Sequence, residues 1–176
     1  YSGRELGGNG VVLVCHNHSL HRMVHRIRII QKENLYKDMI LIADCGSTKT
    51  DWVLLNGSER VAQVFTQGMN ALLLSEDQMS DIIAKELIPH ISADDVTEVY
   101  YYGAGCINAE INSAVERAIR RNMPKADTVE INTDLLAAAR ALCGNKPGIA
   151  CILGTGSNSC YYDGEKIVDN VSPLGY

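Results

Sequence analysis

The stretch Met39-Ile-Leu-Ile-Ala-Asp-Cys-Gly-Ser-Thr-Lys-Thr-Asp51 decides the fold, because it joins an apolar run to a tight polar turn. Met39–Cys45 is apolar except for Asp44, which is typical of a buried strand. Gly46 follows directly, and glycine lets a backbone turn tightly. The sequence therefore predicts a core strand whose end carries an acid and a cluster of small polar residues.

Two more strands are predicted just beyond this turn. Asp51–Leu55 is apolar after its first residue and ends at the hairpin signal Asn56-Gly57. Arg60–Gln67 alternates apolar and polar residues imperfectly and predicts the third strand. Short turns between these segments predict that three antiparallel strands open the domain.

Helical and strand patterns alternate after this antiparallel start. The capping box Ser75-x-x-Gln78 begins a helix that Pro89 is expected to end. The later elements are expected as strands at Val96–Tyr102, Thr128–Ile131 and Ile149–Leu153. Helices are expected with an apolar face from Ile111 to Ile119 and a stop at Met123-Pro124, and at Leu135–Leu142, and a hairpin is expected where Cys160–Tyr162 and Lys166–Val168 flank Asp163-Gly164. This order predicts an α/β fold of the ribonuclease-H-like kind, with one mixed sheet and helices on both of its faces.

Residues 1–38 differ from the rest of the chain in composition. They hold six Lys/Arg and three Asp/Glu, whereas residues 39–176 hold ten and eighteen. We interpret 1–38 as an extension outside the domain, disordered or translated from upstream of a start at Met39, with a short basic helix at Leu20–Ile30. The alternative is a metal site at His16, His18, His21 and His25, but no carboxylate or cysteine cluster completes it. The domain itself is expected over 39–176.

Bulk composition narrows the class of protein. The net charge of −5 argues against nucleic acid as the main partner. The six cysteines form no CxxC pair and several lie in apolar runs, so we expect reduced thiols in a cytoplasmic protein. No apolar run approaches the length of a membrane span, so no membrane partner is expected.

The first turn has the composition of an anion site. Its backbone N–H groups and hydroxyls can wrap the outer phosphates of a nucleotide, with a lysine as an added cation. Asp44 is placed to hold Mg²⁺, usually through water, because Mg²⁺ prefers few carboxylates plus phosphate oxygens. The alternative is an ordinary polar hairpin turn. The candidate phosphate contacts in this turn are Gly46, Ser47, Thr48 and Lys49.

A second turn of the same kind follows the strand Ile149–Leu153. Gly154-Thr155-Gly156-Ser157-Asn158 again places two glycines beside two hydroxyls. Each turn alone has an ordinary turn as its alternative. Two such turns, each ending a core strand, indicate a pair of loops closing on one nucleotide, with Gly154, Thr155 and Gly156 as further phosphate contacts.

Two polar residues between these turns are candidates for substrate chemistry. Asp134 follows a strand and begins an Ala-rich helix, so it is either a general base or a carboxylate that the helix dipole favours. Asn70, in Gly68-Met-Asn70, is either a hydrogen-bonding partner of sugar hydroxyls or a loop cap.

Taken together, these motifs resemble those of the N-acetylglucosamine kinases and their relatives in the BadF/BadG/BcrA/BcrD-type ATPase family. That family belongs to the superfamily of acetate and sugar kinases, heat-shock chaperones and actin. The resemblance runs from about Met39 to the end of the chain. It rests on Asp44-x-Gly-Ser-Thr-Lys-Thr-Asp51, Gly68-Met-Asn70, Thr133-Asp134 and Gly154-Thr-Gly-Ser-Asn158.

The resemblance implies specific roles and cofactors. It implies ATP with Mg²⁺ as cofactors, a small sugar as substrate, and Asp134 as catalytic base; a homodimer is compatible with it. Sugar contacts are implied at Asn70, Asp134, Ser157 and Asn158. Cys45 departs from the glycine of many relatives, and its side chain is expected to crowd the loop slightly.

The resemblance also implies that a second lobe is absent. Family members complete the adenosine pocket and the sugar site beyond the segment that matches here, so we expect an amino-terminal lobe that turns over little by itself. Two other functions stay open. One is an ATPase activator of a 2-hydroxyacyl-CoA or benzoyl-CoA-type dehydratase or reductase, which would hold an iron–sulfur cluster. The other is a non-enzymatic module that senses nucleotide or sugar.

Overall fold

The computed structural model describes residues 4–6, 10–15, 39–153 and 157–174. The chain divides into two compact units. Gln31–Asp134 form the central unit, and Tyr1–Ile30 together with Leu135–Tyr176 form the terminal unit. Each unit is built around its own five-stranded sheet.

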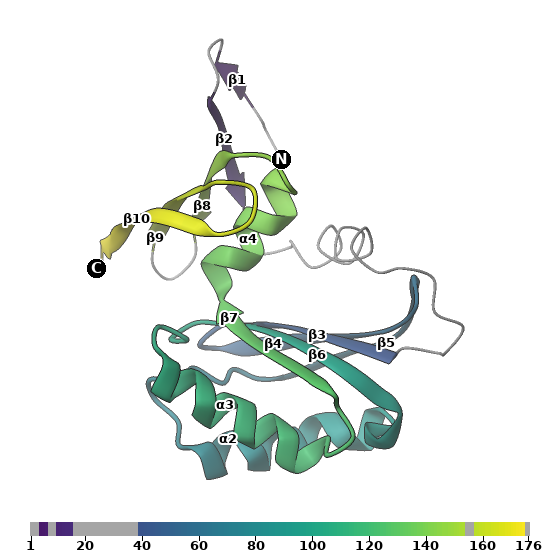
Figure 1. Ribbon diagram of the computed structural model, residues 1–176. Helices are drawn as coiled ribbons and strands as arrows, with labels where there is room; N and C mark the ends of the chain where they lie inside the picture. Colours follow the sequence, from purple (N-terminus) through teal and green to yellow (C-terminus); the bar gives the residue numbers. More distant parts are fainter. Residues whose placement is uncertain (1–3, 7–9, 16–38, 154–156, 175–176) are drawn as a thin grey trace. The chain divides into compact units, whose positions relative to one another are not determined.

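The sheet of the central unit is mixed, and its strands run in the order β5-β4-β3-β6-β7 (Figure 1). The strands are β3 (Met39–Cys45), β4 (Lys49–Asn56), β5 (Glu59–Gln67), β6 (Val96–Gly103) and β7 (Thr128–Thr133). The β3–β4 and β4–β5 pairs are antiparallel, whereas β3–β6 and β6–β7 are parallel. The predicted antiparallel start followed by crossovers is thus confirmed.

Two helices of the central unit connect these strands. α2 (Glu76–Ile82) begins at the predicted capping box. The Ser75 hydroxyl accepts from the Gln78 N–H, and the Gln78 side-chain oxygen accepts from the Ser75 N–H. The helix does not run as a regular α-helix to Pro89. It continues as a π-helical turn (Ile83–Leu87) and a 3-10 turn (Ile88–His90).

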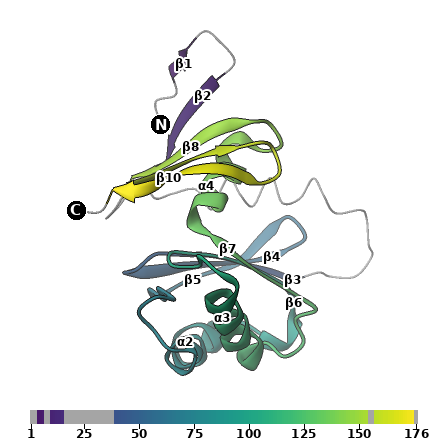
Figure 2. The ribbon, with the colours of Figure 1, turned by 60° about the vertical axis from the view of Figure 1, so that its left-hand side comes forward.

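The second helix, α3 (Ala109–Asn122), also starts at a polar cap, the side chain of Asn108. A further 3-10 turn, Ala93–Asp95, leads into β6. α2 and α3 lie on the same face of the sheet (Figures 1 and 2). The sequence predicted helices on both faces of the sheet. Within this unit, α2 and α3 cover one face.

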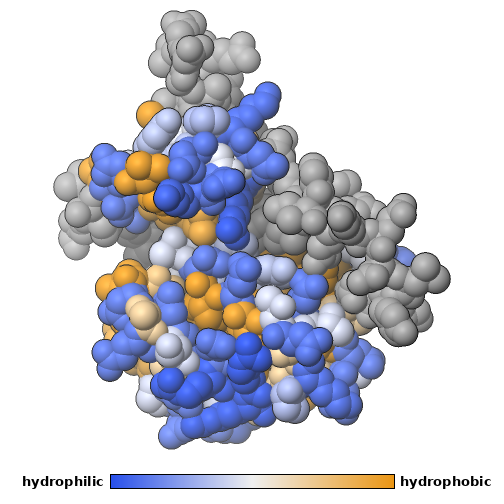
Figure 3. Space-filling view, in the orientation of Figure 1, coloured by the Kyte–Doolittle hydropathy of each residue, from blue (hydrophilic) through white to orange (hydrophobic). Residues whose placement is uncertain are grey.

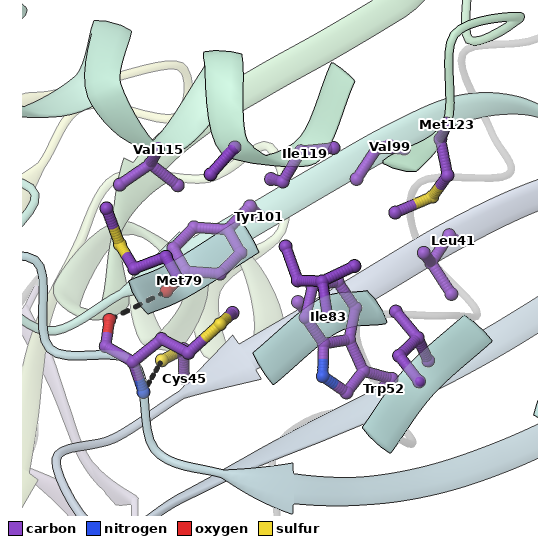
Figure 4. Packing of buried hydrophobic residues seen from close by; sticks show 14 of the residues in the cluster. Leu41, Cys45, Trp52, Met79, Ile83, Val99, Tyr101, Val115, Ile119 and Met123 are labelled. Atoms are coloured by element: carbon purple, nitrogen blue, oxygen red, sulfur yellow. Dashed lines mark hydrogen bonds between the residues drawn. The ribbon is translucent and has the colours of Figure 1, made fainter. Parts of the chain in front are cut away.

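The core of the central unit lies between this sheet face and the two helices (Figure 4). Trp52 and Tyr101 are its largest buried side chains, with ring centroids 6.0 Å apart. Each has a partner for its polar atom: Trp52 Nε1 donates to Thr66 Oγ1 at 3.0 Å, and the Tyr101 hydroxyl donates to the Met69 carbonyl at 3.1 Å. Burying each large apolar side chain here contributes about 1.5–3 kcal/mol to folding.

The outer surface of the helical layer is mostly hydrophilic (Figure 3). Arg121 lies 2.6 Å from the Asp77 carboxylate, and Arg117 lies 2.8 Å from that of Glu76, so both ion pairs join α3 to α2. The Arg121–Asp77 pair is exposed on both sides, whereas Glu76 is half-buried, and surface pairs of this kind each add under about 1 kcal/mol.

The terminal unit has a second sheet in the order β1-β2-β8-β9-β10. Its elements are β1 (Arg4–Leu6), β2 (Gly10–Cys15), α4 (Asp134–Cys143, whose first residue belongs to the central unit), β8 (Gly148–Leu153), β9 (Ser157–Tyr162) and β10 (Ile167–Leu174). β2 pairs parallel with β8, and the other neighbours are antiparallel. A small core of Leu135, Ala139, Ala150, Cys160 and Tyr162 fills this unit.

This second sheet differs from the single sheet that the sequence predicted. β8 was expected to join the strands of the central unit, but it pairs with β2 and β9 instead. The predicted hairpin at Asp163-Gly164 is confirmed, and the Asp163 carboxylate accepts from the N–H groups of Glu165 and Lys166, both at 2.8 Å. Arg4–Leu6 and Gly10–Cys15 form strands, whereas the helix predicted at Leu20–Ile30 and the four amino-terminal histidines lie outside the described residues. That residues 1–38 are an extension stays a prediction.

Candidate functional site

The first predicted phosphate turn joins β3 to β4 in the central unit. Gly46, Ser47 and Thr48 form the turn, closed by a 2.9 Å hydrogen bond from the Gly46 N–H to the Lys49 carbonyl. Gly46 to Lys49 are all exposed, whereas Cys45 and Thr50 on either side are buried. Ser47 and Thr48 of this turn, and Lys49 at the start of β4, are thus open to solvent between buried neighbours, as an anion site requires.

Asp44 lies at the base of this turn and is half-buried. Its pKa is raised to about 6, first by burial, then by the negative charges of Asp134 and Asp51, with Lys49 acting in the opposite direction. Asp51 stands opposite Asp44 in the β3–β4 pair. A half-buried carboxylate among other acids has an electrostatic cost that a bound cation would relieve.

Asp134 comes to this site through the parallel part of the sheet. β3, β6 and β7 run parallel, so their carboxyl ends meet at one edge. Asp44 lies near the end of β3, and Asp134 follows the last residue of β7. The influence of the Asp134 charge on Asp44 shows that the two predicted acids are brought together.

Asp44 has the ligand chemistry that Mg²⁺ uses in proteins. The described residues hold no group of three or more His, Cys, Asp or Glu that could surround a metal ion. Mg²⁺ is usually held by one or two carboxylates, with water and phosphate oxygens completing its coordination. Asp44, next to the phosphate turn, is the residue that fits this role.

Asn70 is joined directly to the phosphate turn. Its side-chain Nδ2 donates to Ser47 Oγ at 3.0 Å, and its Oδ1 accepts from the Leu72 N–H at 3.0 Å. The Gly68 N–H also donates to the Thr48 carbonyl at 3.1 Å. The candidate sugar loop and the candidate phosphate turn therefore form one hydrogen-bonded structure.

Two glycines allow this close contact between the loops. A Cβ on Gly68 would lie 2.5 Å from the carbonyl oxygens of Gly46 and Ser47. Gly105 has a φ of +86°, and a Cβ there would lie 2.5 Å from Asn70 Oδ1. Neither glycine could be identified as a site residue from the sequence, because a glycine in a loop does not reveal which backbone it approaches.

Cys45 supports the same contact from inside the fold. Its fully buried Sγ accepts from Thr50 Oγ1 at 3.1 Å. It also accepts from the Met69 N–H at 3.2 Å (Figure 4). The expectation that this side chain crowds the loop is wrong, because the thiol points into the core. Nothing in the sequence distinguished it from an ordinary buried cysteine.

The second predicted turn belongs to the terminal unit. Gly154, Thr155 and Gly156 lie outside the described residues, so their phosphate contacts stay a prediction. Ser157 and Asn158 open β9, opposite Leu153 and Ile152 of β8. Asn158 Oδ1 is buried and makes no hydrogen bond within the described part of the chain. Their roles as sugar contacts stay predictions.

Other expectations concern thiols and membranes. Cys45, Cys106, Cys151 and Cys160 are free thiols, as expected of reduced cysteines. Among the described residues, no helix is both long enough and apolar enough to span a membrane.

Comparison with solved structures shows a strong likeness to a protein of known structure. The structure matches that of the "putative N-acetylglucosamine kinase" of Porphyromonas gingivalis with a TM-score of 0.75 and 44% sequence identity. The match covers 78% of this chain and 49% of that protein, so the chain spans about half the length of its neighbour. No family model matches the chain, and no curated protein does.

Weaker matches share 16% identity with the chain and have TM-scores below 0.5. They are YeaZ from Pseudomonas aeruginosa (TM-score 0.40, 76% of this chain and 66% of that one) and an Aquifex aeolicus Ppx/GppA phosphatase (0.44, 78% and 52%). At that level of similarity they tell nothing about function. The P. gingivalis match confirms what the motifs predicted, namely that this chain is similar to the amino-terminal part of an N-acetylglucosamine kinase-like protein.

Proposed function

We propose that this chain provides the phosphate-binding and catalytic-base half of an ATP-dependent kinase for N-acetylglucosamine or a related amino sugar. The observation that supports it most is that Asp44 and Asp134 lie at the carboxyl ends of the parallel strands β3 and β7, with the exposed turn Gly46–Lys49 directly after Asp44's strand. The likeness to the P. gingivalis protein supports the same class of reaction. The ribonuclease-H-like topology with a second lobe in the complete enzyme is part of this proposal.

In this proposal the two acids have different tasks. Asp44 holds the magnesium ion that accompanies the nucleotide, usually through a water molecule. Asp134 accepts the proton of the attacking sugar hydroxyl, the 6-hydroxyl by family analogy, and orients that hydroxyl toward the γ-phosphate. The hydroxyls and N–H groups of Ser47 and Thr48, with Lys49, stabilise the negative charge of the phosphates.

The other sugar contacts come from the residues that the resemblance implied. Asn70 in the central unit, and Ser157 and Asn158 in the terminal unit, would bind hydroxyl or acetamido groups. The buried Asn158 Oδ1, which has no partner in the described part of the chain, supports this for one residue. A hydrogen-bonding sugar group would satisfy that oxygen.

The proposal is tested with the full-length gene product, MgATP and N-acetylglucosamine, with ADP release and sugar phosphate measured together. Asp134→Asn is expected to lower kcat by at least about a hundredfold while MgATP still binds, because removing a general base costs that much. Asp81→Asn, which changes an exposed ion pair on α2, is the matched control and should leave kcat unchanged.

The same preparation separates the alternatives. Stoichiometric iron and a brown colour would favour the dehydratase or reductase activator. Nucleotide or sugar binding without sugar phosphate would favour a sensing module. Full turnover by Asp134→Asn would show that Asp134 is not the base.

A further inference from the structure

Asn70 has a second task that its predicted role as a sugar contact does not include. The orientation of its amide is determined by the backbone: Oδ1 accepts from the Leu72 N–H at 3.0 Å, so the NH₂ group faces Ser47. An N–H group can only donate, and Ser47 Oγ therefore accepts this hydrogen bond. The Ser47 hydroxyl is left to donate its own hydrogen elsewhere.

The surroundings of Ser47 indicate where that hydrogen points. Ser47 is exposed, and its turn follows directly after β3, whose next-to-last residue is Asp44. Phosphate oxygens accept hydrogen bonds and donate none when ionised. A serine that accepts from an amide and donates outward is therefore suited to a phosphate group.

Further contacts hold the Asn70 loop against the turn that carries Ser47. The Gly68 N–H donates to the Thr48 carbonyl at 3.1 Å, and the Met69 N–H donates to Cys45 Sγ at 3.2 Å. There is no space for a Cβ at Gly68 or at Gly105. Three consecutive residues, Gly68, Met69 and Asn70, are thus each hydrogen-bonded to the phosphate turn or to Cys45 beside it.

We propose that Asn70 is a positioning residue for nucleotide binding: its amide directs the Ser47 hydroxyl toward a nucleotide phosphate, and it thereby couples the sugar loop to the phosphate turn. This inference rests on the proposed kinase function. It predicts that changing Asn70 weakens nucleotide binding through Ser47, in addition to any effect on the sugar.

Asn70→Asp is the sharpest variant. An aspartate keeps the acceptor for the Leu72 N–H, so the loop retains its turn, but it cannot donate to Ser47. The Ser47 hydroxyl would then donate to the new carboxylate and be lost to phosphate. The added negative charge also repels phosphate, so this variant is measured in a cycle with Ser47→Ala.

The experiment measures the Kd of MgATP and both KM values for the full-length protein and the variants Asn70→Asp, Asn70→Ala, Ser47→Ala and the two double variants. Asn70→Ala and Ser47→Ala are each expected to raise the Kd of MgATP by about tenfold, the size of one hydrogen bond to a charged group. In the Ser47→Ala background, Asn70→Ala should change that Kd less than twofold. In that background Asn70→Asp should weaken binding only through its added negative charge. Its effect on the Kd of MgATP should therefore be at least threefold smaller than in the chain that keeps Ser47.

A matched pair of the same residue types controls for the general loss of an Asn–Ser contact. Asn122 Nδ2 donates to Ser80 Oγ at 3.0 Å between the helices. Asn122 ends α3, which leads into β7 at the opposite end of the parallel strands from Asp44. Asn122→Asp and Ser80→Ala should change neither KM.

The outcomes are distinguishable. If Asn70→Ala raises only the KM of the sugar, or if its effect on MgATP is the same with and without the Ser47 hydroxyl, the positioning role is refuted while the kinase proposal stands. If the unsubstituted full-length protein binds no MgATP, the proposed function fails and this inference fails with it.

Discussion

The carboxylate of Asp134, the residue that follows β7, raises the pKa of Asp44, the next-to-last residue of β3, although the strand β6 lies between β3 and β7 in the sheet. Burial contributes more, and Asp51 contributes less, so that the pKa of Asp44 reaches about 6. The protein therefore carries an electrostatic cost at neutral pH in the place where a cation and phosphates are proposed to bind.

Removing the charge of Asp44 should stabilise the chain in the absence of metal and nucleotide. The pKa rises from 3.8 to about 6, and about two units correspond to a gain of up to about 3 kcal/mol in the free energy of unfolding for Asp44→Asn. Because the folded-state pKa lies above the unfolded one, the cost is fully present above pH 6. It declines as the pH falls through 6 and is gone below about 3.8.

Urea unfolding in EDTA at several values between pH 4 and pH 8 measures this effect. The advantage of Asp44→Asn over the natural chain should be largest at pH 8 and should disappear near pH 4. Asp81→Asn, at an exposed ion pair, is the control and should show no such trend. An equal advantage at every pH would mean that the ionisation of Asp44 carries no cost.

Gly68→Ala should separate the Asn70 loop from the phosphate turn after β3. The new Cβ would lie 2.5 Å from backbone atoms of Gly46 and Ser47, which cannot rotate away as a side chain could. We expect a loss of about 1–3 kcal/mol in unfolding free energy and at least tenfold weaker MgATP binding by the full-length protein.

Gly57→Ala is the matched control for Gly68→Ala. Gly57 has a φ of +57° in the β4–β5 turn, but nothing lies within 4 Å of a Cβ there. It should cost about 1 kcal/mol through backbone strain and leave MgATP binding unchanged. Equal losses of MgATP affinity in both variants would show that packing at Gly68 is not the cause.

Features of the fold and the site could be predicted from the sequence where they depend on residues that are neighbours in the chain. The turn after β3, the Asn56-Gly57 hairpin and the Ser75 capping box follow from neighbouring residues and were predicted. The meeting of Asp44 with Asp134 follows from parallel strands whose carboxyl ends share an edge, so it could be inferred from the order of elements.

Other features depend on partners that are distant in sequence. The apolar run of β8 fits any buried strand, and only its pairing with β2 assigns it to the second sheet. The thiol of Cys45 and the space beside Gly68 depend on the backbone around Met69 and Ser47. Hydrophobic periodicity contains no information about such contacts. The contact between the Asn70 loop and the phosphate turn after β3 therefore could not be predicted.

The buried thiols should resist alkylation in the folded chain. Burial raises the pKa of Cys45, and it raises that of Cys106 to about 12, with the Cys45 and Asp134 charges adding to the effect. At pH 8 the reactive thiolate form of Cys106 is then about one part in ten thousand. Iodoacetamide labelling followed by peptide mass spectrometry should modify half-buried Cys151 well before Cys45 or Cys106. In urea all three should react alike, and early labelling of Cys45 in the folded chain would contradict its buried position.

Lys49 links the two charge effects of the site, so Lys49→Gln should change both. Lys49 lowers the pKa of Asp44, and its removal should raise that pKa above 6 and shift the pH dependence of stability upward. MgATP affinity of the full-length protein should also fall about tenfold, because an exposed cation beside the phosphates is lost. Lys85→Gln, which removes an exposed lysine paired with Asp81, should alter neither property.

The Asp44→Asn comparison, repeated in the Lys49→Gln background, measures the shift in pKa, and MgATP titration measures the affinity. A shift in stability without a change in affinity would place Lys49 near Asp44 but away from the phosphates.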